Sequence, residues 1–124
     1  MGSIRPERVA ERVQREVTDI LANRLRDPRL AGVTVTDVEV SGDLKLATIF
    51  VSTLAAGEER RRTLAALDRA APAVRHELAP RLGLREVPAV RFRFDESIER
   101  GARVEDLLRK IKSGEPLEEE DDAS

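Results

Sequence analysis

Residues able to perform acid–base or nucleophilic chemistry are few in this chain, and their spacing does not form a catalytic site. The sequence has 124 residues with one histidine, His76, and no cysteine. His76 follows Val74 by two residues in an apolar helical pattern, so we expect it on the solvent side of its helix, without the base and orienting group that an activated nucleophile needs. The glycines form neither a phosphate-binding loop nor a dinucleotide fingerprint. We therefore predict no catalytic residues, no cofactor and no enzymatic activity.

The acidic residues Asp95, Glu96 and Glu99 form the cluster that comes nearest to a site for a hard cation. A calcium loop requires oxygen ligands at alternating positions and a glycine at its turn. The cluster has neither feature. We interpret Asp95 as a strand-end cap or a solvated charge, and we predict no metal site.

Charge is distributed unevenly along the chain. The formal net charge is -2, but residues 115–124 carry six acidic residues and no basic one. The remaining residues hold 22 Lys and Arg against 18 Asp and Glu, a net charge of +4. A basic body with an acidic tail is frequent among proteins that meet nucleic acid. The high share of arginine favours phosphate contacts, although a coding bias toward arginine explains that share equally well.

Arginines recur on one side of the first predicted helix, residues 6–25, away from its apolar residues. At about 100° per residue, four of them lie within roughly 60° of one another: Arg8, Arg12, Arg15 and Arg26. An ordinary solvated helix face would show the same pattern. The chain has no Trp or Tyr, and we place its three Phe in the core, so RNA contacts should reach phosphates rather than stacked bases. The candidate RNA-binding residues, on this helix and on residues 58–82, are Arg8, Arg12, Arg15, Arg69, Arg75 and Arg81.

The first half of the chain predicts a helix followed by a β-hairpin. Apolar residues at steps of three and four indicate an amphipathic helix over residues 6–25, which Asp27-Pro28 ends. Residues 33–40 and 45–52 are rich in β-branched side chains and flank a turn. The first of these strands changes phase between Val35 and Val38, so we expect a β-bulge there.

The second half predicts a kinked pair of helices and a third strand. Pro72 interrupts the apolar helical pattern of residues 58–82, so we expect two helices that meet at Ala70-Ala71-Pro72. Residues 90–95 alternate apolar and charged side chains, as a half-buried strand does. The order α-β-β-α-α-β predicts an α+β fold in which the kinked helix pair packs on a three-stranded sheet.

We predict one domain, residues 5–112, and an acidic disordered tail, residues 113–124. The chain is long enough for one modest core, and a short helix over residues 104–111 closes the domain. The tail has too few apolar residues to order itself. No apolar run approaches the roughly 20 residues that cross a bilayer, and the first residues form neither a signal peptide nor a myristoylation site. We therefore expect a cytoplasmic protein.

Three stretches of the chain, by their order and spacing, resemble a known family. They are residues 16–30 (EVTDILANRLRDPRL), 33–52 (VTVTDVEVSGDLKLATIFVS) and 84–97 (LREVPAVRFRFDES), followed by Gly101 and Leu107-Leu108. From Arg5 to about Ile111 the chain resembles ribosome-binding factor A, a family of bacterial assembly factors of the small ribosomal subunit.

The resemblance implies a type II KH-like domain, in which an Ala-x-Gly helix kink replaces the Gly-x-x-Gly loop of ordinary KH domains. Here the kink motif is Ala70, Ala71 and Pro72, with proline where the family has glycine. The resemblance also implies a non-catalytic protein that binds the immature 30S subunit and its 16S rRNA near the decoding region, and we expect it to be a monomer. Such a factor helps the ends of this rRNA mature, particularly in the cold. In some species an assembly GTPase helps the factor leave.

Two other functions fit the residues alone. The first is a protein-interaction module without RNA contact, which binds another protein through residues 6–25 or through the sheet. The second is a small hydrolase whose site has no recognisable pattern, and whose activity would be lost on replacing His76 or Asp95. Salt separates RNA binding from the first alternative, because phosphate contacts weaken steeply with salt and an apolar interface barely responds.

Overall fold

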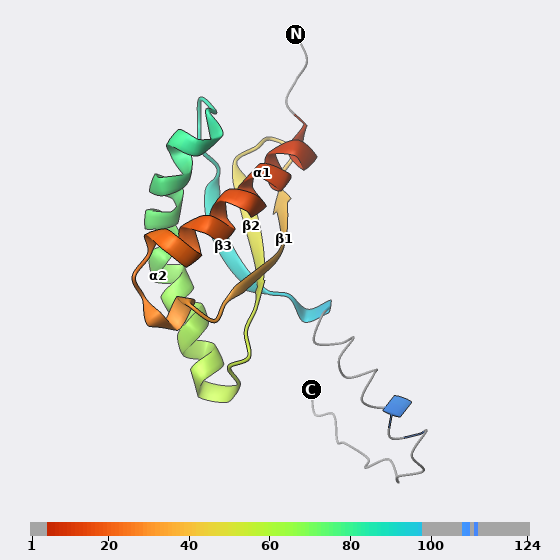
Figure 1. Cartoon of the computed structure of the whole chain (residues 1–124). Coiled ribbons are helices and arrows are strands. Elements are labelled where there is room, and N and C mark those ends of the chain that lie inside the picture. Colours follow the sequence, from red (N-terminus) through yellow and green to blue (C-terminus); the bar gives the residue numbers. More distant parts are fainter. Residues whose placement is uncertain (1–4, 98–107, 110, 112–124) are drawn as a thin grey trace.

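A three-stranded sheet with helices packed on one face forms the domain (Figure 1). The computed structural model describes residues 5–97, 108, 109 and 111. Along the chain the elements are α1 (Pro6–Asp19), the π-helical segment η1 (Ile20–Arg24), the 3₁₀ turn η2 (Pro28–Leu30), β1 (Thr34–Val40), β2 (Leu46–Ser52), α2 (Gly57–Leu82) and β3 (Ala89–Phe94). This arrangement confirms the predicted α+β class.

The first helix begins as predicted, and its helical run ends at Arg24, within one residue of the predicted end. Pro6 stands in the first turn of α1, where its missing N–H costs no helical hydrogen bond. The buried side chains of α1 recur at helical spacing: Val9, Val13 and Val17. After Asp19 the chain widens into η1, and Leu25 is extended, with φ -106° and ψ 131°. Arg26 therefore lies outside the helix, so it does not continue the line of Arg8, Arg12 and Arg15.

In the sheet, β1 is antiparallel to the central strand β2, and β3 is parallel to it. All three strands lie within one residue of their predicted ends. The register of β1 on β2 shifts between Val35 and Asp37, which confirms the predicted bulge. Thr36, at the bulge, donates a hydrogen bond from Oγ1 to Asp95 Oδ2 at 2.6 Å. The bulge is thereby tied to the residue that follows β3.

The prediction of two helices that meet at Ala70-Ala71-Pro72 is wrong, because α2 is one helix from Gly57 to Leu82 with Pro72 inside it. A proline removes one helical hydrogen bond and crowds the preceding turn, at a cost of about 3 kcal/mol. Residues on both sides of Pro72 belong to the same core, since Leu67 and Val74 are fully buried. Packing against one sheet therefore keeps both halves in a single helix. α2 ends as predicted at Gly83, whose φ of 63° favours glycine.

The core lies between the helices and one face of the sheet. Ile49 of β2 is fully buried there, and Phe92 of β3 is 4% exposed. Phe94 packs at the edge of this core, 3.8 Å below the guanidinium of Arg60. Phe50 follows Ile49, so it faces the opposite side of the sheet, where it is half-buried. The prediction that all three Phe lie in the core is therefore wrong for Phe50.

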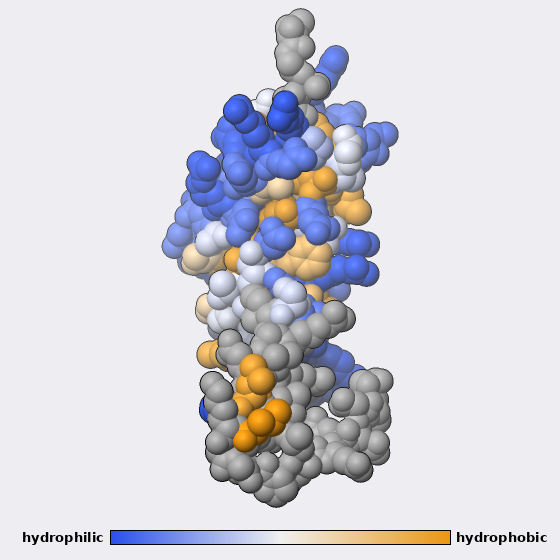
Figure 2. All heavy atoms as spheres, turned by 90° about the vertical axis from the view of Figure 1, so that its right-hand side faces the viewer, coloured by the Kyte–Doolittle hydropathy of each residue, from blue (hydrophilic) through white to orange (hydrophobic). Residues whose placement is uncertain are grey.

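Hydrophilic side chains cover much of one face of the domain (Figure 2). Figure 2 shows hydrophilic residues over much of the face on the right of Figure 1, around a smaller hydrophobic area. No described helix is long and apolar enough to cross a membrane.

Only part of the C-terminal prediction falls on described residues. Of the predicted helix over residues 104–111, Leu108, Arg109 and Ile111 are described and helical. Leu108 and Ile111 are 52% and 57% exposed. The other residues of that helix and the predicted tail, residues 113–124, lie outside the described residues.

Candidate nucleic-acid interface

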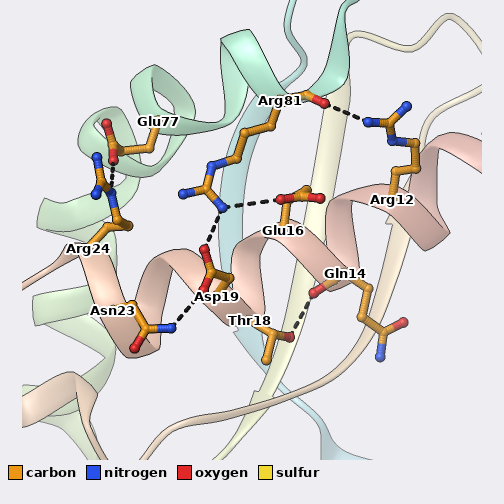
Figure 3. Close-up of polar contacts among 9 residues, drawn as sticks. All are labelled: Arg12, Gln14, Glu16, Thr18, Asp19, Asn23, Arg24, Glu77 and Arg81. Carbon is orange, nitrogen blue, oxygen red and sulfur yellow. Dashed lines mark hydrogen bonds and ion pairs between the residues drawn. The ribbon is translucent and has the colours of Figure 1, made fainter.

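Ion pairs join α1 and η1 to the last turns of α2 (Figure 3). The Arg81 guanidinium donates through Nη1 to Asp19 Oδ2 at 2.6 Å and to Glu16 Oε1 at 3.1 Å. One turn earlier on α2, Glu77 Oε1 accepts a hydrogen bond from Arg24 Nε at 2.8 Å. These contacts fix the C-terminal end of α2 against the first helical segment.

The ion pairs shift the titration of their members. Hydrogen bonds from Arg81 and Asn23 hold the pKa of Asp19 below its ordinary value. The hydrogen bond from Arg24 lowers the pKa of Glu77 in the same way. The hydrogen bond to Asp19 raises the pKa of Arg81 above its ordinary value. Each of these groups therefore carries its charge at neutral pH.

Two of the predicted RNA-binding residues, Arg12 and Arg81, are engaged within the domain. Arg12 Nη2 donates to the backbone oxygen of Arg81 at 2.7 Å, in the last turn of α2, where carbonyl groups lack helical partners. The side chain of Arg81 is 23% exposed and lies against two carboxylates. Both residues therefore hold α2 against α1, and Arg81 offers little of its guanidinium to a phosphate.

Three other predicted residues face solvent. Arg8 and Arg15 on α1 and Arg69 on α2 are exposed. Within the described part of the chain, no hydrogen bond or ion pair engages their side chains. Their guanidiniums are available to phosphates.

The sixth predicted residue, Arg75, anchors the loop between α2 and β3. Its Nε and Nη2 donate to the carbonyl oxygen of Val87 at 3.3 and 2.8 Å. The kink motif lies beside it, since Ala71, Pro72 and Arg75 line one hollow of about 650 Å³. Ala70 and Ala71 are half-buried, and Pro72 is exposed. The structure thus brings Arg75 and the motif together, whereas Arg8 and Arg15 lie on another helix.

A further basic surface appears only in the folded chain. The connector of residues 23–32 runs beside α2 and forms two hollows with it, of about 440 and 450 Å³. Arg26 lines the first hollow, and Arg29 and Arg62 line the second. All three are exposed. We call these two hollows together, with their arginines Arg26, Arg29 and Arg62, the connector groove. No local spacing could indicate it, because its residues come from segments far apart in the sequence.

His76 and Asp95, the residues considered for catalysis, lie apart from each other in solvent and at the end of β3. His76 is exposed, as predicted. Asp95 Oδ1 accepts a hydrogen bond from the backbone N–H of Ser97 at 3.0 Å, which confirms its interpretation as a strand-end cap. The described residues contain no group of three His, Cys, Asp or Glu that could hold a metal ion. Glu99, the third acid of the predicted cluster, lies outside the described residues.

The family of the chain follows from a match to a family model. The model of ribosome-binding factor A matches residues 5–108. The chain belongs to the ribosome-binding factor A family. The match begins at the residue before α1, so it includes both helices and the whole sheet. The resemblance stated from the sequence is thereby confirmed.

Two solved structures and one fitted homology model are similar to this chain in fold. A crystal structure of ribosome-binding factor A from Thermus thermophilus is 26% identical, with a TM-score of 0.64, over 73% of this chain and 96% of that chain. A solution structure of a Thermotoga maritima protein described as a ribosome-binding factor A is 35% identical, with a TM-score of 0.63, over 70% of this chain and 83% of that chain. A homology model of the Thermus thermophilus factor, fitted into a cryo-electron microscopy map of a 30S complex, is 28% identical, with a TM-score of 0.58, over 70% of this chain and 91% of that chain.

Proposed function

We propose that this protein is a non-catalytic assembly factor that binds the immature 30S subunit through the phosphates of its 16S rRNA. Its family and the 30S complex of the Thermus thermophilus factor support this partner. The observation that carries the proposal is a set of exposed arginines that have no hydrogen bond or ion pair among the described residues: Arg8, Arg15, Arg26, Arg29, Arg62 and Arg69.

Guanidinium groups suit this task because they stay charged and bind phosphate oxygens through paired N–H donors. Each phosphate that they neutralise releases counterions from the RNA, which favours binding at low salt. Several of the free arginines project from α1 and α2, whose relative position is held by the Arg81 and Arg24 ion pairs. Their spacing is therefore set before RNA arrives, and a partner of fixed shape, such as folded rRNA, fits such a surface.

Binding of this kind acts by selecting one conformation of the rRNA until later assembly steps make it permanent. We extend the proposal to the late maturation of 16S rRNA and to its particular importance in the cold. The factor would act as a cytoplasmic monomer, with residues 5–112 as the binding domain and residues 113–124 as a disordered acidic tail. An assembly GTPase would assist its release. The kink motif at Ala70, Ala71 and Pro72 stays part of the proposed surface through the neighbouring Arg75.

The test is the binding of the full chain to immature small subunits, measured over a range of salt concentrations. Replacing both Arg26→Gln and Arg69→Gln should weaken binding at low salt and reduce the slope of log affinity against log salt by roughly one unit per lost contact. The matched control is Arg93→Gln, an exposed arginine on β3 that alternates with inward-facing Phe92. Equal slopes for the double variant and the control would contradict phosphate binding by these arginines.

One observation favours the alternative of a protein-interaction module. The sheet face away from the helices carries half-buried Phe50, and this aromatic side chain would suit a protein partner. In that case Phe50→Ala would weaken the association, and the affinity of the natural chain would change little with salt.

A further inference from the structure

Leu54 is the most exposed large hydrophobic residue of the described chain, at 102% of its reference area. It lies on the loop between β2 and α2, where local hydrogen bonds hold the backbone. Thr53 Oγ1 accepts a hydrogen bond from the N–H of Ala55 at 3.2 Å, and the Ala56 carbonyl accepts one from the N–H of Arg60 at 3.4 Å. These contacts hold the loop backbone, and the Leu54 side chain projects from it into solvent.

Leu54 lines one hollow of the connector groove, the one of about 450 Å³, together with apolar Pro28 and Ala55. Arg29 and Arg62, whose side chains make no hydrogen bond or ion pair among the described residues, line it too. A single exposed leucine is ordinary on a protein surface. Apolar side chains that line the same hollow as two guanidiniums without partners in the described chain are a more specific arrangement, because one ligand can contact both kinds of group.

The second wall of the hollow is also fixed in place. Asp27 Oδ1 accepts a hydrogen bond from the backbone N–H of Arg29 at 2.9 Å, which caps the turn η2. Leu30, at the end of that turn, is 2% exposed and anchors it in the core. The backbone of this wall is therefore held in place before any ligand binds, and the ordering that binding requires is confined to exposed side chains.

We propose that this hollow binds one unpaired nucleotide of the small-subunit rRNA, and the proposal rests on the function proposed above. The base lies against Leu54, Ala55 and Pro28, and the flanking phosphates contact Arg29 and Arg62. Charge favours RNA over a protein, because two guanidiniums and the one carboxylate of Glu59 leave the hollow positive. An unpaired nucleotide is required because a base inside a duplex is stacked and cannot offer its face to a side chain.

The two kinds of contact differ in their response to salt. Lost phosphate contacts reduce the slope of log affinity against log salt, because fewer counterions are released. A lost apolar contact releases no counterions, so it lowers the affinity by the same factor at every salt concentration. One salt titration can therefore separate the contribution of Leu54 to binding from that of Arg29 and Arg62.

The experiment measures binding of the full chain to immature small subunits over a range of salt for three variants. Leu54→Asn should weaken binding about tenfold at every salt concentration, with an unchanged slope. Leu54→Met, which keeps an apolar side chain of similar length, should bind like the natural chain. The double variant Arg29→Gln with Arg62→Gln should reduce the slope by roughly two units. All three should fold normally, because the altered side chains are exposed and make no hydrogen bond within the described chain.

A photoreactive diazirine analogue of leucine at position 54 identifies the occupant. Cross-links to unpaired nucleotides of the rRNA would support the proposal, and cross-links to a ribosomal protein or to paired nucleotides would overturn it. Natural affinity for Leu54→Asn would overturn it as well, even if the double arginine variant loses slope as expected. A double arginine variant of unchanged slope would instead count against phosphate binding in the hollow, whatever Leu54→Asn shows.

Discussion

The guanidinium of Arg81 lies 2.6 Å from Asp19 Oδ2, although 62 residues separate them in the sequence. This contact ties the end of α2 to the end of α1 (Figure 3). The side chain of Arg81 is 23% exposed and that of Asp19 is 47% exposed, so the pair is partly shielded from water. Arg81, which the sequence predicts to bind RNA, thus holds α1 and α2 together. The exposed arginines of these two helices are the ones available to RNA.

Replacing Arg81→Gln should lower the melting temperature, because Asp19 and Glu16 lose the cation between them. The matched control is Arg61→Gln, since Arg61 pairs with Glu58 at 2.6 Å with side chains 81% and 60% exposed. Exposed pairs contribute little to stability. Thermal unfolding followed by circular dichroism should therefore show a clear shift for Arg81→Gln and almost none for Arg61→Gln. Equal shifts would contradict a structural role for the Arg81 contacts.

The same pair predicts a pH dependence. Because the pKa of Asp19 is lower in the folded chain than its ordinary value of 3.8, its contribution to stability is present above that value and is lost as the pH falls through the folded pKa. The difference in free energy of unfolding between the natural chain and Arg81→Gln should thus be largest near neutral pH and shrink below about pH 4. Urea unfolding at several pH values measures it. A difference that grows on acidification would refute this assignment.

Pro72 should destabilise α2, because it is exposed and stands inside a continuous helix. Replacing Pro72→Ala restores a backbone N–H and a residue of high helix propensity, and should raise the free energy of unfolding by about 1–2 kcal/mol. Pro72→Gly should lie about 1 kcal/mol below the alanine variant, since glycine loses more backbone entropy. Chemical unfolding of the three chains gives the order. A less stable alanine variant would show that the proline ring itself supports the fold.

The arginines of α1 should separate into a structural and a binding group. Replacing Arg8→Gln and Arg15→Gln together should leave stability unchanged and reduce the salt slope of small-subunit binding by roughly two units. Arg12→Gln should lower the free energy of unfolding by about 0.5–1 kcal/mol, because its hydrogen bond to the last turn of α2 is lost. A lower free energy of unfolding for the double variant of Arg8 and Arg15 would instead indicate that these residues stabilise the fold.

Truncation after Gly114 tests the proposed division into domain and tail. The removed residues, 115–124, hold six acids and two apolar residues, Leu117 and Ala123. They should add nothing to the core, so the melting temperature should stay nearly unchanged. A large decrease would mean that the tail packs on the domain.

Local patterns in the sequence sufficed for most of the secondary structure. Apolar residues at helical spacing predict α1, and β-branched residues with a turn between them predict the hairpin. The phase change between Val35 and Val38 even predicts the bulge, because each residue of a strand must face one side of the sheet. These features depend on neighbours a few residues away, which a sequence displays directly.

Only the tertiary structure decided whether Pro72 breaks its helix and whether Arg81 is paired. Proline weakens a helix locally, yet the burial of Leu67 and Val74 in one core keeps α2 continuous. A solvent-facing charge and a paired charge look alike in a helical pattern, and only the position of Asp19 on another helix makes Arg81 a packing residue.

The connector groove has the same origin. Arg29 and Arg62 meet because the connector runs beside α2, and Leu54 joins them from a third segment. The sequence determined the elements and the excess of arginine, since these are properties of local spacing and composition. Which arginines are free, and what lies next to them, was decided by packing, because long-range contacts assign each side chain its partners.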